Sequence, residues 1–146
     1  MKQFQGRVVV PGTMKAEALV SHFGFNTLAS FQKSLMFGDK NVTCSDQNNP
    51  DLHGKPMNGK ALCLPQTIGS TTGGMVLYCA AALSRKPACL LFSKPIDSLA
   101  AAGVILADVW TDASMPTVDS LGDEFLEAVQ TGMTVTIEEN GLVTIE

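Results

Sequence analysis

The residue types best suited to chemistry gather in one short segment, residues 66–73, which is rich in glycines and hydroxyl side chains. Ser70 lies within it, directly after Gly69 and before two threonines. If a helix begins just after this segment, its first backbone N–H groups lack intrahelical partners and carry partial positive charge. Such a position favours a carboxylate or a phosphate. The segment therefore predicts an anion-binding site that the Ser70 hydroxyl faces.

The runs on either side of this segment are typical of a strand and a helix. Residues 60–64, which are apolar apart from Lys60, form a run that ends at Pro65, the pattern of a buried strand. Residues 75–83 are rich in alanine and other good helix formers. In a simpler interpretation, Ser70, Thr71 or Thr72 only caps this helix. The glycine spacing matches neither a P-loop, nor a dinucleotide fingerprint, nor a hydrolase elbow.

The remaining pattern predicts one mixed α/β domain over residues 1–146, with β-rich ends and a central parallel β-α-β unit. Further strands are expected at residues 4–10, 15–21, 41–44, 88–93 and from 109 onward, further helices at 99–106 and 121–130, and a hairpin at 133–137 and 142–145 around Asn140-Gly141. The expected caps are Asp97 or Ser98 for the first of these helices and Asp119 or Ser120 for the second. Residues 37–59 are rich in turn formers, and a loop of this length is usually functional.

The composition is apolar and poor in charge. Of all residues, 45% are hydrophobic and 16% are charged, whereas an average soluble domain carries about 25% charged residues. Because a surface covered by a partner needs fewer charges, this deficit indicates a subunit of a larger assembly. The net charge of −4 and the scattered basic residues predict no binding to nucleic acid or to a membrane surface. With no visible signal sequence or membrane span, the expected location is the cytoplasm.

The metal-ligating residue types are too dispersed to predict a site on this chain. Four cysteines lie far apart without a Cys-x-x-Cys pair, and outside a secretory context they are expected to be free thiols. Three of them, Cys63, Cys79 and Cys89, sit in apolar runs, where a thiol behaves as a small hydrophobic group. The two histidines, His22 and His53, lack the grouping of a zinc site.

From Gly59 to Gly73 the chain carries the pattern Gly-Lys-x-Leu-x-Leu-Pro-x-x-x-Gly-Ser-x-x-Gly. This pattern resembles the small, swivelling subunit of the aconitase X family. The resemblance covers nearly the whole chain and includes Glu17–Val20, Pro50-x-Leu52-x-Gly54, Lys94-Pro95, Thr131-Gly132 and the terminal hairpin. It implies a three-layer β/β/α swivelling domain. It also implies a large partner subunit that holds an iron–sulfur cluster or a metal ion, with no cofactor on this chain.

The resemblance further implies a hydro-lyase that is active only with its large subunit. The family dehydrates small hydroxy acids, namely cis-3-hydroxy-L-proline in bacterial members and mevalonate 5-phosphate in archaeal ones. The serine that matches Ser70 is the expected proton acceptor. Elimination needs a base on one side and a Lewis acid on the other, and a helix N-terminus would stabilise the alkoxide of such a base. The residues expected to shape the substrate site are Gln66, Thr67, Ile68, Gly69, Thr71, Thr72 and Gly73.

Two departures from the family pattern bear on this expectation. Many relatives carry an arginine directly before the Gly-Ser pair, where this chain has Ile68. Isoleucine cannot bind a phosphate as a guanidinium does and suits ring methylenes better, so cis-3-hydroxy-L-proline is the expected substrate and mevalonate 5-phosphate the alternative. Asn49 replaces a histidine that often precedes the proline, so any role of that histidine does not carry over.

Two questions stay open at this stage. His22, Phe23 and Asn26 are further candidates for substrate contact, with core or loop roles as the alternative. A different class of function is a non-catalytic module, in which the same loop binds a carboxylate or phosphate ligand.

Overall fold

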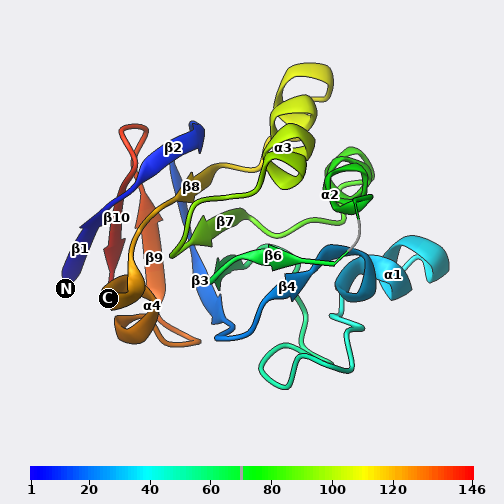
Figure 1. Cartoon of the computed structure of the whole chain (residues 1–146), viewed down its shortest axis with the longest axis horizontal. Helices are drawn as coiled ribbons and strands as arrows, with labels where there is room; N and C mark the ends of the chain where they lie inside the picture. The colour runs from blue at the N-terminus through cyan, green and yellow to red at the C-terminus, as the bar shows by residue number, and fades with distance from the viewer. Residues whose placement is uncertain (70) are drawn as a thin grey trace.

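The computed structural model describes residues 1–69 and 71–146, which form two β layers with a layer of helices on one side (Figure 1). The strands are β1 (Lys2–Gln5), β2 (Arg7–Val10), β3 (Met14–Val20), β4 (Phe25–Asn26), β5 (Ala61–Leu64), β6 (Thr67–Ile68), β7 (Cys89–Phe92), β8 (Thr117–Asp119), β9 (Thr134–Ile137) and β10 (Leu142–Ile145), and the helices are α1 (Thr27–Phe37), α2 (Gly73–Ala82), α3 (Ser98–Trp110) and α4 (Asp123–Ala128). Helices α1, α2 and α3 lie on one side of the parallel strands, and β1, β9 and β10 lie on the other. The three-layer β/β/α arrangement is therefore confirmed.

The two β layers are parts of one hydrogen-bonded sheet that turns back on itself. The strand order is β1-β10-β9-β3-β5-β7-β8-β2. Strand β3 belongs to both layers, because its first half pairs antiparallel with β9 and its last three residues pair parallel with β5. Only Gly6 separates β1 from β2. A Cβ at Gly6 would lie 2.4 Å from Val118 Cγ1, so the corner between the layers needs glycine.

The middle strands are buried on both faces. Every residue of β5 and of β7 is buried, the continuous apolar pattern expected of parallel strands between two layers. Side chains such as Leu62 and Phe92 pack in the cluster shared with the helices, whereas Cys63 and Leu91 pack in the cluster shared with the second β layer. Burying a single leucine or phenylalanine contributes about 1.5–3 kcal/mol, so these two strands anchor the domain.

The central parallel unit is confirmed and fixes where the site can lie. Strand β5 pairs parallel with β3 on one side and with β7 on the other, and β7 pairs parallel with β8. The carboxyl ends of adjacent parallel strands meet at one edge of a sheet, and ligands of α/β folds bind beyond that edge. The segments 21–26, 65–72 and 93–97 all begin there.

The elements expected from the sequence differ from the structure in several places. The strand expected over residues 4–10 is two strands, divided at Gly6. The strand expected from residue 109 is wrong, since Val109 and Trp110 form the end of α3. Residues 41–44 form no strand, and only an isolated bridge joins Thr43 to Pro56. Helix α1 and strand β8 were not expected.

The helix caps and the thiols were partly foreseen. Asp97 caps α3 as expected, with its carboxylate accepting from the backbone of Leu99 and Ala100 at 3.0 Å each. Neither Asp119 nor Ser120 caps α4: its N-cap is Gly122, and Asp119 is the buried last residue of β8. All four cysteines are free, and burial raises the pKa of the Cys89 thiol to about 12. In the described part of the chain, none of the helices is both long and apolar enough to span a bilayer.

Candidate functional site

A small two-stranded sheet holds the predicted site segment in place. Strands β4 and β6 pair parallel, with Phe25 opposite Thr67 and Asn26 opposite Ile68. The backbone N–H of Phe25 donates to the carbonyl of Gln66 at 2.8 Å. The segment that follows β3 is thereby fastened to the segment that follows β5, at the edge where the parallel strands end.

Gly69 marks the turn out of β6. Its φ of +106° lies in the region that favours glycine, and an added Cβ would lie 3.0 Å from the side chain of Asn26. Asn26 itself caps α1, because its Oδ1 accepts from the backbone N–H of Ala29 at 3.1 Å. Asn26, one of the three further candidates for substrate contact, therefore lies against the site segment.

The predicted helix does begin at the end of the segment. Thr72 occupies the N-cap position of α2, and Gly73 is its first residue. A Cβ at Gly73 would lie 2.8 Å from the hydroxyl oxygen of Thr27, so α1 and α2 approach closely at this point. Ser70, the predicted base, lies outside the described residues. The first backbone N–H groups of α2 supply the positive end of a helix dipole beside the segment.

A cavity of about 250 Å³ opens between this segment and the start of α3. Four of the predicted substrate-site residues line it, namely Thr67, Ile68, Gly69 and Gly73. Sequence reasoning missed its other lining residues, which are Thr27, Asp97, Leu99 and Ala100. The position of Asp97 just after β7, the parallel neighbour of β5, was the signal that could have found it.

Asp97 is held in one orientation by three hydrogen bonds. Its Oδ2 accepts from the backbone of Leu99 and Ala100, and its Oδ1 accepts from the Thr67 hydroxyl. The carboxylate therefore ties the site segment to the N-terminus of α3. It is also exposed to solvent, and it is the one ionisable side chain among the described residues that line the cavity.

The other predicted residues lie outside this cavity. Gln66 is exposed and takes part through its backbone carbonyl, and Thr71 lines a neighbouring groove. His22 lines a separate cleft together with Lys55, and its Nδ1 lies 3.4 Å from the carboxylate of Asp51. Phe23 is half exposed and lines neither the cavity nor the cleft that contains His22.

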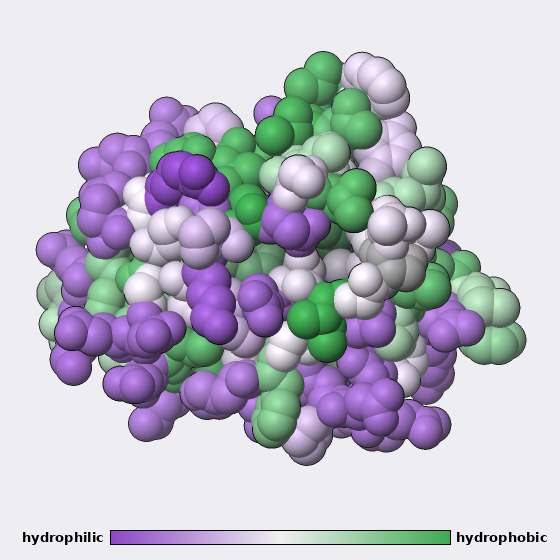
Figure 2. Space-filling view, in the orientation of Figure 1, coloured by the Kyte–Doolittle hydropathy of each residue, from purple (hydrophilic) through white to green (hydrophobic). Residues whose placement is uncertain are grey.

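An apolar groove of about 220 Å³ runs between α2 and α3 next to the cavity. We call it the α2/α3 groove; its lining residues are Thr71, Gly74, Met75, Tyr78, Leu99, Ala102, Gly103, Leu106 and Trp110. Leu99 lines both the groove and the cavity, so the two are adjacent. Figure 2 shows hydrophobic surface gathered over α3, and the large side chain of Trp110 is 69% exposed.

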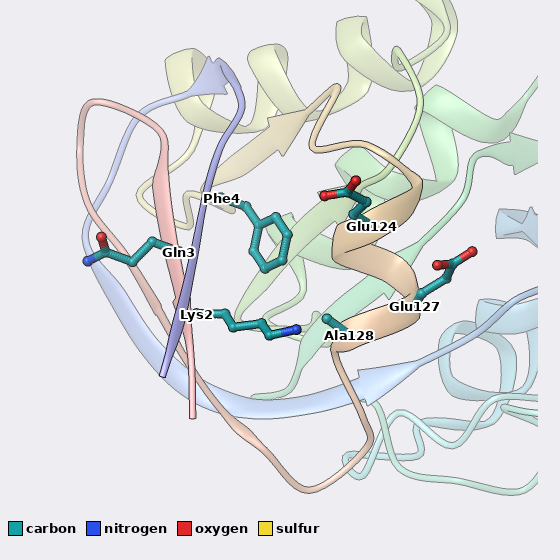
Figure 3. Close-up of a pocket in the computed structure, with 6 residues that line it drawn as sticks. All are labelled: Lys2, Gln3, Phe4, Glu124, Glu127 and Ala128. Atoms are coloured by element: carbon teal, nitrogen blue, oxygen red, sulfur yellow. The ribbon is translucent and has the colours of Figure 1, made fainter.

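A larger cleft lies elsewhere in the molecule and holds none of the predicted residues. It measures about 540 Å³ and opens between β1 and α4 (Figure 3). Lys2 and Phe4 point from β1 toward α4, and the Phe4 ring packs edge-on against Phe125 with centroids 5.4 Å apart. Glu124 and Glu127 form its α4 side. Among the described residues of the whole chain, no group of three or more His, Cys, Asp or Glu side chains could hold a metal ion.

Two stacked β layers under one helical layer, with a glycine-rich loop at the carboxyl ends of the parallel strands, define a swivelling domain. The structure is similar to that of Thermococcus kodakaraensis aconitase X in its holo-form, with a TM-score of 0.82 and 25% sequence identity. That similarity covers 100% of this chain and 99% of the other.

The aconitase X swivel domain model matches residues 3–145, and the chain belongs to this family. One similar relative is the phosphomevalonate dehydratase small subunit of Thermococcus onnurineus, 26% identical over 99% of this chain and 98% of the relative. Another is the phosphomevalonate dehydratase small subunit of Aeropyrum pernix, 30% identical over 63% of this chain and 64% of the relative. The family resemblance seen in the sequence is therefore confirmed.

Proposed function

We propose that this chain is the small subunit of a hydro-lyase that dehydrates a small hydroxy acid, with Ser70 as the base. The observation that carries the proposal is the match to the aconitase X swivel domain over residues 3–145, together with a cavity beside the predicted site segment. The small-subunit names of the relatives support a second, larger chain in the assembly.

The surroundings of the site segment suit removal of a proton next to a carboxylate. The N-terminus of α2 supplies backbone N–H groups that stabilise both the carboxylate of the substrate and the alkoxide of a serine base. At an exposed helix end this effect is worth only about 0.3–1 kcal/mol. Closure by a partner would exclude water and strengthen it. The metal ion or iron–sulfur cluster that we expect on the large subunit would supply the Lewis acid for the departing hydroxyl.

The α2/α3 groove is the surface that we assign to the large subunit. It adjoins the cavity, since Leu99 lines both, so a chain that covers the groove would also reach the edge of the cavity. Helix α2 carries no charged residue, and α3 carries only Asp108. Helices with at most one charge and with exposed methionine and tryptophan side chains are typical of the central part of an interface.

The apolar side chain at position 68 supports cis-3-hydroxy-L-proline as the substrate. Ile68 is half exposed and lines the cavity, where it can contact ring methylenes. No described lining residue of the cavity is a lysine or an arginine. The relatives' names favour a second candidate, mevalonate 5-phosphate.

The test is the activity of the chain purified together with its large subunit, with both hydroxy acids as substrates. Ser70→Ala should lower turnover at least about a hundredfold, the low end of general-base contributions. Ser114→Ala, in the connection between α3 and β8, is the matched control and should leave turnover unchanged. Normal turnover of Ser70→Ala would leave only a capping role for this serine. Dehydration by the isolated chain would contradict the division of the site between two subunits.

A further inference from the structure

We infer that Asp97 is a specificity-determining residue that binds a positively charged nitrogen of the substrate; this inference rests on the proposed function. The cavity beside the site segment has Asp97 as the one ionisable side chain among its described lining residues. Its other lining groups are threonines, glycines and apolar side chains. Thus the only formal charge that the described part of the cavity offers to a ligand is negative.

The geometry leaves this carboxylate able to bind one more donor. An ionised carboxylate has about four lone-pair positions. Two backbone N–H groups occupy Oδ2, and the Thr67 hydroxyl occupies one position on Oδ1. The side chain is exposed and fixed at both oxygens, so a further donor on Oδ1 would meet a preorganised acceptor.

The chemistry of the two candidate substrates differs at this point. Cis-3-hydroxy-L-proline carries a secondary ammonium group next to the carbon that loses its proton. Mevalonate 5-phosphate carries a carboxylate and a phosphate and has no cationic group. Charge-assisted hydrogen bonding favours the first, and repulsion between like charges disfavours the second. The carboxylate therefore selects an imino acid, in agreement with the apolar side chain of Ile68.

The experiment compares Asp97→Asn with the wild-type chain, each assembled with the large subunit. Asparagine caps helices about as well as aspartate, so this variant removes the charge and keeps the cap of α3. We expect the KM for cis-3-hydroxy-L-proline to rise about tenfold while kcat changes less than twofold. The inhibition constant of cis-2-hydroxycyclopentane-1-carboxylate, in which a methylene replaces the nitrogen, should not change. Asp108→Asn, exposed on the same helix, is the control.

The outcomes separate this inference from the proposed function. An unchanged KM, or equal weakening of the imino acid and its carbocyclic analogue, would overturn the role of Asp97. So would a wild-type complex that dehydrates only mevalonate 5-phosphate, although the assignment as a hydro-lyase would then stand. A complex that dehydrates no hydroxy acid would overturn both.

Discussion

Gly74 of α2 and Gly103 of α3 face each other where the two helices cross, and neither has room for a side chain. A Cβ on Gly103 would lie 2.2 Å from the carbonyl oxygen of Gly74, and a Cβ on Gly74 would lie 2.1 Å from that of Leu99. The crossing stands directly behind the α2/α3 groove, which both glycines line. Because α2 begins at the site segment, the close crossing also sets the distance between that segment and Asp97.

The first prediction is that Gly103→Ala destabilises the fold. Alanine in a helix gains about 1 kcal/mol over glycine in intrinsic propensity, but overpacking against backbone costs about 1–3 kcal/mol. We expect a net loss of about 1 kcal/mol in the free energy of unfolding, measured by urea denaturation. Asp108→Ala tests propensity on the exposed face of the same helix and should be neutral or slightly stabilising. An equally stable Gly103→Ala variant would show that the helices separate without cost.

The sequence pattern predicted the central strands and the terminal hairpin well because their apolar residues follow a clear pattern. Strands β5 and β7 are continuous apolar runs, and the terminal hairpin alternates around Asn140-Gly141. Helix α1 was not predicted for a physical reason: its buried face carries three hydroxyl residues, Thr27, Ser30 and Ser34, so the segment is less hydrophobic than α2 and α3. Residues 109–110 pointed to a strand because valine and tryptophan favour strands, yet α3 continues through both residues, whose side chains are largely exposed.

The candidate site was predicted in part. The segment between β5 and α2 follows from order and composition, but its partners come from other loops that only the topology brings near. Asp97 was expected only as a helix cap. Its hydrogen bond to Thr67 joins two segments that lie far apart in the sequence, so the sequence pattern could not predict it. His22 was a candidate by residue type alone, and the structure places it in a separate cleft with Asp51.

The second prediction concerns acid stability and the buried carboxylate of Asp119. Its side chain is fully buried and accepts from Arg7 Nε at 2.9 Å, from Arg7 Nη2 at 2.5 Å and from the backbone of Ile96 at 2.7 Å. Burial alone would raise the pKa of Asp119, but these hydrogen bonds and the guanidinium charge outweigh it and lower the pKa. An aspartate whose pKa is lowered by folding stabilises the native state above its unfolded pKa of about 3.9.

This stabilisation should be lost as the pH falls below about 4 and through the lowered pKa of the folded protein. We expect Asp119→Asn to cost about 2 kcal/mol of unfolding free energy at pH 7. The difference from wild type should shrink as the pH is lowered from 6 to 3. Urea denaturation at each pH measures it, with Asp112→Asn, an exposed aspartate, as the control. A difference that stays constant with pH would contradict a lowered pKa.

The third prediction tests the α2/α3 groove as the surface for the large subunit. Trp110 lines the groove at the end of α3 and stacks edge-on against Tyr78, with ring centroids 6.4 Å apart. Because Trp110 is largely exposed, Trp110→Ala should alter the stability of the isolated chain little. At the centre of an interface such a truncation costs about 2 kcal/mol or more, so the Kd for the large subunit should rise at least about thirtyfold.

Calorimetric titration of the large subunit with the variant gives this Kd. The matched control is Phe37→Ala, an aromatic side chain that is 79% exposed at the end of α1 and does not line the groove. The control should bind like wild type. If both variants lose affinity equally, or if neither does, the groove is not the docking surface.

The fourth prediction is that Ile68→Arg shifts the choice of substrate. The Ile68 side chain is half exposed and lines the same cavity as Asp97. It also packs closely on Gly24: a Cβ added to Gly24 would lie 2.6 Å from Cγ2 of Ile68. A guanidinium at this place would compete with the substrate's ammonium group for Asp97 and would offer a bidentate partner to a phosphate. We expect kcat/KM for mevalonate 5-phosphate to rise about tenfold relative to that for cis-3-hydroxy-L-proline, measured with the assembled complex.

Ile68→Met keeps an apolar side chain and should leave the ratio unchanged. A ratio that also stays constant in Ile68→Arg would place substrate selection on the large subunit, because a charge introduced into the cavity must act on any phosphate bound there.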